Sequence, residues 1–283
     1  MVTTFLHRPY VFAFLIAFLV LGRLYFGWRK TFLWLVIGYV VAWASEFSSI
    51  HNGFPYGLYH YVYENMPGEL MVLGVPFWDS LSYPFMIFAG YTTAEFILKG
   101  APKNVIPAEA GIQNTSRAPA TVFRRNDVYA ALLGAFLTML LDIIIDPLTV
   151  RGDRWFLGNI YYYPNGGEYF GVPLTNFFGW FLVPLAVIVL FLFLSSPRRR
   201  GSPDSQWDSR FRGNDKTLGN DKPRLRYFLP PLFYLSIALF NIAITVWINE
   251  PLIVAIDCFL LIPIVGLVIY RVKSISQISS GAL

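Results

Sequence analysis

Charged residues are scarce in this sequence of 283 residues, since Asp, Glu, Lys and Arg together make up 14%. Soluble domains carry about 25% charged residues, whereas here hydrophobic types reach 55% and the mean hydropathy is +0.51. This composition argues against a soluble globular domain and against a disordered chain. The single cysteine excludes a disulfide framework and a thiolate metal cluster.

Long apolar stretches are what the sequence has instead. A membrane-spanning helix needs about 20 mostly apolar residues, and the sequence predicts an all-α polytopic membrane helix bundle of about seven transmembrane helices. Residues 1–283 are expected to form a single integral-membrane domain. The predicted spans are roughly Tyr10–Phe26, Thr31–Ile50, Pro76–Leu98, Val128–Ile145, Phe177–Leu194, Tyr227–Trp247 and Leu252–Tyr270.

Basic residues are unevenly distributed over the segments that join these spans. Of the 22 Lys and Arg, 19 fall on one alternate set of segments and three on the other. Because cytoplasmic segments carry the excess of Lys and Arg, this pattern predicts an N-terminus outside and a cytoplasmic C-terminus. The expected location is the cell membrane, with the lipid bilayer as a partner.

Two polar segments, residues 99–127 and 195–226, differ in composition from the rest and predict disordered cytoplasmic insertions. They hold 14 basic and six acidic residues, which leaves eight basic and 11 acidic residues for the remaining chain. The net charge of +5 therefore belongs to the insertions, and no nucleic-acid partner is predicted. Alternatively, the arginines at 198–200 bind anionic lipid directly after the fifth span.

Carboxylates inside the predicted spans are costly, so each is a candidate for function. Asp142 and Asp146 are four residues apart and are expected to share one helix face. Two close carboxylates in a low dielectric do not both ionise easily, so one is expected to stay protonated and serve as a general acid. The alternative is that Asp146 caps a turn and Asp142 pairs with a neighbour. Pro147 is expected to end the helix. The carboxylates predicted at the same outer depth are Glu46, Asp79, Asp142, Asp146 and Asp257.

The predicted outer loops, residues 51–75 and 146–176, are long and rich in Tyr and Trp. Long ordered loops are usually functional. Their aromatic residues fit either an interfacial belt or the lining for an elongated apolar ligand, where ring faces would stabilise a carbocation. His51 and His60 have no metal-ligand spacing, and no metal site is predicted.

Two motifs resemble a known family. The first is Glu46 followed by GFPYGLYHY at 53–61 and LGVP at 73–76, and the second is LDIIIDP at 141–147 with YFGVPLTNFFGW at 169–180. Together they resemble the carotenoid biosynthesis membrane proteins that include the carotenoid 1,2-hydratases and the bisanhydrobacterioruberin hydratase, over roughly residues 35–182. Tyr56, where the family more often has Phe, and the stretch 78–83 depart from that pattern.

The resemblance implies a metal-independent hydro-lyase without a cofactor, which adds water across a terminal C=C of an acyclic carotenoid. Either Asp142 or Asp146 is then expected to donate the proton, and either Glu46 or Glu168 to orient or deprotonate the water. Other carotenoid-pathway membrane enzymes are candidate partners. The residues expected to bind the water or the polyene end are Tyr56, Tyr59, His60, Trp155, Tyr169, Asn176 and Trp180.

Two other functions fit parts of the pattern. In an intramembrane prenyltransferase or lycopene elongase, Asp142 and Asp146 would coordinate Mg²⁺ on a diphosphate. Such an enzyme needs a second aspartate-rich motif and nearby basic residues, and the outer segments hold only three Lys or Arg. In a transporter the acidic cluster would relay protons, but no broken-helix pair or internal repeat supports transport. A non-catalytic scaffold for carotenoid enzymes is the remaining alternative.

Overall fold

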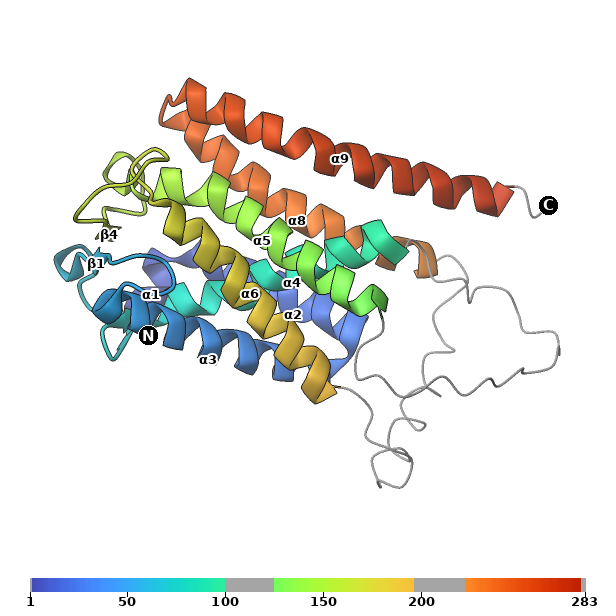
Figure 1. The fold of residues 1–283 in the computed structure, drawn as a ribbon, viewed down its shortest axis with the longest axis horizontal. Coiled ribbons are helices and arrows are strands. Elements are labelled where there is room, and N and C mark those ends of the chain that lie inside the picture. Colours follow the sequence, from blue (N-terminus) through green and yellow to red (C-terminus); the bar gives the residue numbers. More distant parts are fainter. Residues whose placement is uncertain (1, 100–124, 196–221, 281–283) are drawn as a thin grey trace.

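Each apolar segment predicted as a span forms a long helix. The computed structural model describes residues 2–99, 125–195 and 222–280, and Figure 1 shows the long helices side by side. A short helix, α1 (Val2–His7), precedes them. Among the described residues every strand is two residues long, so the all-α prediction is confirmed. The long helices are α2 (Pro9–Phe26), α3 (Trp28–Asn52), α4 (Phe77–Lys99), α5 (Arg125–Thr149), α6 (Leu174–Ser195), α8 (Lys222–Trp247) and α9 (Pro251–Ser280).

Six of these helices, α2, α3, α5, α6, α8 and α9, are long and apolar enough to cross a membrane. The protein is therefore a multi-pass integral membrane protein. The helix α4 has 23 residues but is not among the six, so the seventh span stays a prediction, as does the orientation. The insertions predicted at 99–127 and 195–226 lie outside the described residues, apart from edges that belong to α4, α5, α6 and α8.

The helix α4 is enclosed by other helices. Residues 83–94 are all buried, and α4 contacts α2, α3, α5 and α8. Its closest approach to α5 depends on two glycines: a Cβ added at Gly90 would lie 2.4 Å from Thr138 Oγ1, and one added at Gly134 would lie 2.8 Å from Tyr91 Cα. Small residues permit such close approach between membrane helices, so α4 is shielded from lipid by its neighbours.

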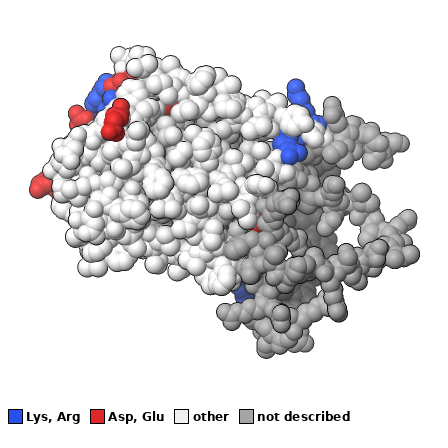
Figure 2. Space-filling model, viewed as in Figure 1, with Lys and Arg blue, Asp and Glu red and all other residues white. Residues whose placement is uncertain are grey.

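Charged side chains gather at the two ends of the bundle on the face shown in Figure 2, with a wide uncharged band between them. The helix α9 contributes large exposed apolar side chains, among them Phe259, Ile262 and Tyr270. A continuous apolar surface of this kind suits contact with lipid.

Pro147 does not end its helix, so that prediction is wrong. The helix α5 continues through Pro147 to Thr149. Proline lacks an N–H and forfeits one helical hydrogen bond, but the neighbouring bonds form. The Thr149 hydroxyl donates to the Ile145 carbonyl at 3.0 Å, and the Val150 N–H donates to the Asp146 carbonyl at 3.0 Å. Asp146 is therefore held within regular helix rather than in a loop.

A short antiparallel ladder joins the two long ordered loops at one end of the bundle. The strand β1 (His60–Tyr61) pairs with β4 (Tyr161–Tyr162), with Tyr61 opposite Tyr161. The Val62 N–H extends the pairing by donating to the Ile160 carbonyl at 2.8 Å. The ladder therefore brings together tyrosines that lie far apart in the sequence.

A hairpin and two short 3₁₀ turns complete these loops. The strands β2 (Met71–Val72) and β3 (Val75–Pro76) are antiparallel neighbours. Leu73 and Gly74, which connect them, have φ values of 50° and 85°, as a two-residue type I′ turn requires. The 3₁₀ turns are η1 (Tyr63–Asn65) and η2 (Gly152–Arg154). The two loops at this end of the bundle thus have a defined backbone structure.

A buried ion pair fastens the start of α2 to these loops. Arg8 is 2% exposed, and its guanidinium donates two hydrogen bonds to the Glu69 carboxylate, at 2.9 and 3.2 Å. A third hydrogen bond runs to the Leu157 carbonyl at 2.6 Å, and the guanidinium lies 4.6 Å from the centre of the Trp78 ring. Bidentate pairing fixes both partners geometrically, so one side chain joins α2 to the loops before α4 and after α5.

Candidate active site

The carboxylates of Asp142 and Asp146 lie on one face of α5, as their spacing predicts. Asp142 is 0% exposed and Asp146 is 7% exposed. Asn176, in the first turn of α6, donates through its amide nitrogen to Oδ2 of both carboxylates, at 2.7 Å each. The two Oδ2 atoms are therefore no more than twice 2.7 Å apart. Two buried carboxyl groups this close can share one proton.

Tyrosines of the loop after α5 complete the hydrogen bonding of Asp146. The Tyr161 hydroxyl donates to Oδ1 at 2.8 Å, and the Tyr163 hydroxyl donates to Oδ2 at 3.5 Å. Burial raises the pKa of Tyr161 well above its ordinary value, and the Asp146 carboxylate adds to the rise, so this hydroxyl stays protonated. Asp142 Oδ1, in contrast, is buried without a hydrogen-bond partner among the described residues.

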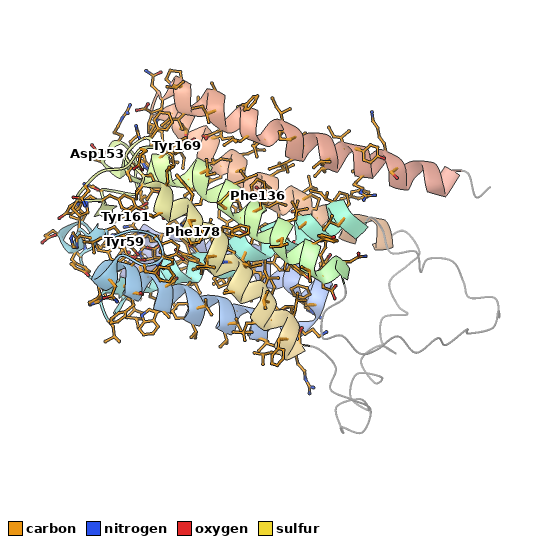
Figure 3. All side chains as sticks on the ribbon, in the orientation of Figure 1. Tyr59, Phe136, Asp153, Tyr161, Tyr169 and Phe178 are labelled. Atoms are coloured by element: carbon orange, nitrogen blue, oxygen red, sulfur yellow. The ribbon has the colours of Figure 1, made fainter. Side chains whose placement is uncertain are left out.

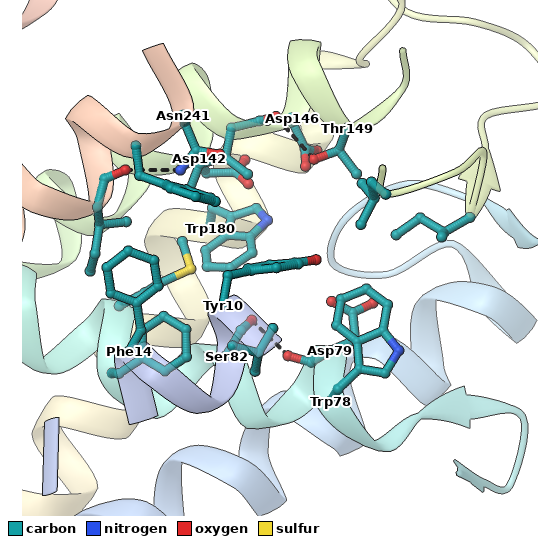
Figure 4. A pocket seen from close by; sticks show the side chains of 18 of the residues that line it. Tyr10, Phe14, Trp78, Asp79, Ser82, Asp142, Asp146, Thr149, Trp180 and Asn241 are labelled. Carbon is teal, nitrogen blue, oxygen red and sulfur yellow. Dashed lines mark hydrogen bonds between the residues drawn. The ribbon is translucent and has the colours of Figure 1, made fainter. Parts of the chain in front are cut away.

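Both carboxylates line a cavity of about 110 Å³ whose walls come from α2, α4, α5, α6, α8 and the loop after α5. Figure 4 shows Asp142 and Asp146 on one side of this cavity and Asp79 on the other. One water needs roughly 10–15 Å³ of such space, so the cavity has room for several waters or for the branched end of an isoprenoid chain. Its polar lining includes Asp79, Ser82, Asp142, Asp146, Thr149 and Asn241.

Aromatic rings make up much of the remaining wall. Trp180 stacks on Tyr83, which lies behind it, with ring centres 4.2 Å apart. Phe240 contacts Tyr10 and Phe14 with ring centres 5.7 and 5.6 Å apart. Ring faces attract cations, so this wall can stabilise positive charge that develops on a ligand. The lining aromatic residues include Tyr10, Phe14, Trp78, Trp155, Trp180 and Phe240.

A cluster of four tyrosines at the β1–β4 ladder connects the two acidic sides of the cavity. Tyr59 packs edge-on against Tyr61, and its ring centre lies 5.5 Å from that of Tyr161. Figure 3 shows Tyr59 and Tyr161 at the loop end of the bundle. The Tyr61 hydroxyl donates to Asp79 Oδ2 at 2.8 Å, while Tyr161 and Tyr163 donate to Asp146. Pairing of the loops therefore positions donors at both acidic sides.

Comparison with known proteins identifies the group to which this arrangement belongs. Residues 8–212 match the family described as carotenoid biosynthesis protein. The chain belongs to this family. The matched region covers α2 to α6 and every wall of the cavity except the one that α8 supplies. No curated protein and no solved structure shows significant similarity to the chain. The protein thus has a role in carotenoid biosynthesis, and the family resemblance predicted from the two motifs is confirmed at this level.

In this carotenoid biosynthesis protein, several predicted site residues meet at the cavity. Asn176 bonds to both members of the acid pair without lining the cavity itself. Tyr56 lies one layer behind, with its ring centre 6.1 Å from that of Trp180, and Tyr59 is also buried, beside Tyr61. The predicted residues that line the cavity are Asp142, Asp146, Trp155 and Trp180.

The two glutamates predicted to handle water lie outside the cavity lining. Glu46 is 2% exposed and accepts a hydrogen bond from the Ser80 hydroxyl, at the contact between α3 and α4. Glu168 is exposed, and its Oε2 accepts a hydrogen bond from the Leu174 N–H at 3.2 Å, at the first residue of α6. Glu168 therefore caps a helix in this structure.

Two further predicted residues also lie away from the cavity lining. His60 is exposed, and its ring centre lies 5.8 Å from that of Tyr162. Tyr169 packs edge-on against Phe177. Burial raises the pKa of Tyr169 to about 12, and the nearby Asp257 carboxylate contributes to the rise. Both residues support the loops rather than the cavity.

The sequence did not identify several residues that the cavity uses. The sequence predicts Asp79 at the same depth as the acid pair, but depth along a span does not specify the direction of a side chain. Ser82, three residues further on, shares its face of α4. Asn241 is a polar residue among apolar ones in α8, and this pattern could have indicated that α8 contributes to the cavity. The lining residues absent from the predicted site include Tyr10, Phe14, Trp78, Asp79, Ser82, Thr149, Tyr161, Phe240 and Asn241.

Neither Lys nor Arg is among the described side chains that line the cavity. Within the described residues, no group of three or more His, Cys, Asp or Glu side chains is placed to hold a metal ion. The described side chains that line the cavity offer carboxyl, hydroxyl, amide and aromatic groups.

Proposed function

We propose that the protein adds water across a terminal C=C of an acyclic carotenoid and so forms a tertiary alcohol. The observation that carries the proposal is the acid pair: Asn176 holds Asp142 and Asp146 together at the wall of an aromatic cavity. In a low dielectric, one proton on two adjacent carboxylates is favoured over two negative charges. The pair then supplies a carboxylic acid at neutral pH.

The proposed reaction needs three contributions from the protein. The acid pair transfers its proton to the CH carbon of the terminal double bond, which leaves a tertiary cation on the carbon that bears two methyl groups. Rings such as those of Tyr10, Trp78 and Trp180 stabilise this cation through their faces. A water in the cavity then forms the C–O bond and releases a proton. No redox cofactor takes part in these steps, which are those of a hydro-lyase.

The volume of the cavity favours binding of one chain end. Pockets that enclose a whole drug-sized ligand are roughly 300–1,000 Å³, whereas this cavity is about 110 Å³. The terminal isoprenoid unit then enters the cavity, while the remaining polyene lies along the apolar helices in the bilayer. Each turnover acts on a single end.

We further propose that α4 is a seventh span, with the N-terminus outside and the C-terminus cytoplasmic in the cell membrane. The helices α2, α3, α5 and α8 enclose α4 and keep its acidic side chains away from lipid. Exposure of such side chains to lipid would be costly in free energy. The excess of Lys and Arg on alternate segments supports the orientation. Accessibility of single introduced cysteines to a membrane-impermeant reagent tests both statements.

The acid pair also fits the diphosphate site of a prenyltransferase, but a diphosphate brings negative charge that needs basic partners. The described lining contains three carboxylates and neither Lys nor Arg, which favours a neutral alkene as the ligand. A scaffold or transporter would leave the pigment chemically unchanged, whereas a hydratase would add a hydroxyl group. One expression experiment therefore distinguishes these functions.

That test expresses the protein alone in a host that makes an acyclic carotenoid, with pigments resolved by chromatography. We expect a hydroxylated carotenoid with the wild type, much less with Asp142→Asn or Asp146→Asn, and none with the double variant. Asp153→Asn, an equivalent change at an exposed loop residue, should leave the product unchanged. Wild-type product from the double variant would remove the acid pair from the mechanism.

A further inference from the structure

Asp79 faces the cavity from the side opposite the acid pair (Figure 4). The helix α4 begins at Phe77, which puts Asp79 in its first turn and Ser82 on the same face three residues later. Because Asp142 and Asp146 come from α5 and Asp79 comes from α4, two helices present carboxyl groups to one small volume. A ligand in the cavity thus has carboxyl groups on two of its sides.

One oxygen of Asp79 is held and the other is available. Oδ2 accepts a hydrogen bond from the Tyr61 hydroxyl at 2.8 Å, and Oδ1 has no hydrogen-bond partner among the described residues. Arg8, the nearby cation, makes its bonds to Glu69 and to the Leu157 carbonyl. Asp79 is therefore oriented by Tyr61 without being neutralised in an ion pair.

A second polar atom on the same side of the cavity also lacks a partner. The indole Nε1 of Trp78 is buried without a hydrogen-bond partner among the described residues, and Trp78 lines the cavity. Buried donors and acceptors of this kind are commonly satisfied by ordered water. Trp78 and Asp79, both in the cavity lining, thus each leave one polar atom without a protein partner at the α4 wall.

Glu46, the other acidic residue near this wall, does not reach the cavity. Its carboxylate accepts from Ser80 at the α3–α4 contact, and it is absent from the lining. Of Glu46 and Asp79, only Asp79 lines the cavity.

We propose that Asp79 is the base that takes the proton from water as the water attacks the carbocation. This inference rests on the proposed hydration. The acid pair forms the C–H bond at the CH carbon, the water oxygen forms the C–O bond at the tertiary carbon, and the released proton goes to Asp79 Oδ1. Water in the cavity returns that proton to the acid pair, so one alkene and one water give one alcohol.

The separation of acid and base makes a specific prediction for Asp79→Asn. Without its base, the enzyme still protonates the alkene, but the cation loses a proton again instead of capturing water. In membranes transferred to D₂O, this reversal leaves deuterium in the recovered carotenoid. The ratio of hydrated product to deuterium exchange should fall about a hundredfold in Asp79→Asn, the lower range for loss of a general base.

This ratio is independent of how much protein folds, because both products come from the same active molecules. Asp79→Glu keeps a carboxylate but moves it by one methylene, so it should give an intermediate ratio. This variant replaces Asp79→Asn in the experiment if Asp79→Asn does not accumulate in the membrane. Glu95→Gln, an acid-to-amide change on α4 outside the cavity, should keep the wild-type ratio. The Asp142→Asn, Asp146→Asn double variant should lose hydration and exchange together.

The outcomes separate this inference from the proposed function. If the wild type produces neither hydration nor exchange, the proposed function fails. If the wild type hydrates and Asp79→Asn keeps the wild-type ratio, Asp79 is not the base and the acid-pair mechanism stands. Loss of both hydration and exchange in a membrane-inserted Asp79→Asn protein would also overturn the inference, since it would place Asp79 in the protonation step.

Discussion

The amide nitrogen of Asn176 lies 2.7 Å from Asp142 Oδ2 and bonds equally to the neighbouring Asp146. Hydrogen bonds to charged groups contribute about 1.5–3 kcal/mol each. Asn176→Ala should therefore lower the hydration rate by roughly tenfold to a hundredfold, which pigment analysis per membrane-inserted protein measures. Thr175→Ala, at the exposed neighbouring position, should have no such effect. Equal rates for the two variants would contradict the role given to Asn176.

The two tyrosines that donate to Asp146 should differ in importance. Tyr161 bonds at 2.8 Å and Tyr163 at 3.5 Å, and hydrogen bonds weaken with distance. Tyr161→Phe removes the stronger donor to the carboxylate that remains after proton transfer, so the acid becomes weaker. We expect about a tenfold loss of hydration rate in Tyr161→Phe and a smaller loss in Tyr163→Phe. The reverse order would show that the shorter bond does not support the acid.

The Arg8–Glu69 pair should determine stability rather than chemistry. Arg8→Ala leaves Glu69, which is 8% exposed, as a buried carboxylate without its cation. Breaking a buried pair in this way costs about 3–5 kcal/mol, so the thermal midpoint of the solubilised protein should fall sharply. Arg23→Ala, at an exposed position of α2, should leave the midpoint near that of the wild type. An unchanged midpoint in Arg8→Ala would show that the pair does not fasten the loops.

Two glycine-to-alanine variants test the close approach of α4 and α5. An alanine at Gly90 would place Cβ 2.4 Å from Thr138 Oγ1 and 2.7 Å from the Gly134 carbonyl oxygen, whereas one at Gly266 has open space around it. Overpacking of this kind costs about 1–3 kcal/mol. Gly90→Ala should therefore lower the thermal midpoint, while Gly266→Ala should not. A midpoint for Gly90→Ala equal to that of Gly266→Ala would show that the two helices can separate freely.

The helices and the acid pair were predictable because they depend on local sequence. Apolar run length predicts a helix, and the four-residue spacing of Asp142 and Asp146 fixes their common face. The helix end predicted at Pro147 is wrong because hydrogen bonds of the neighbouring residues keep the last turn helical. These bonds are not visible as a sequence pattern.

The remaining walls of the cavity depend on contacts between distant segments. In lipid, the outward face of a helix is as apolar as the inward face, so periodicity does not indicate that Tyr10 and Phe240 face the same space. The β1–β4 ladder consists of two residues on each strand, too few for an alternating pattern to predict. The direction of Asp79 likewise depends on how α4 packs, which depth along the span does not specify.

The origin of the oxygen in the product tests the central claim most directly. Membranes that contain the protein and an acyclic carotenoid are incubated in ¹⁸O-labelled water, and the pigments are analysed by mass spectrometry. Acid-catalysed hydration predicts one ¹⁸O atom for each hydroxyl group added, with equal yield in the absence of O₂. A hydroxylated product without ¹⁸O, or a product that forms only with O₂, would contradict the account.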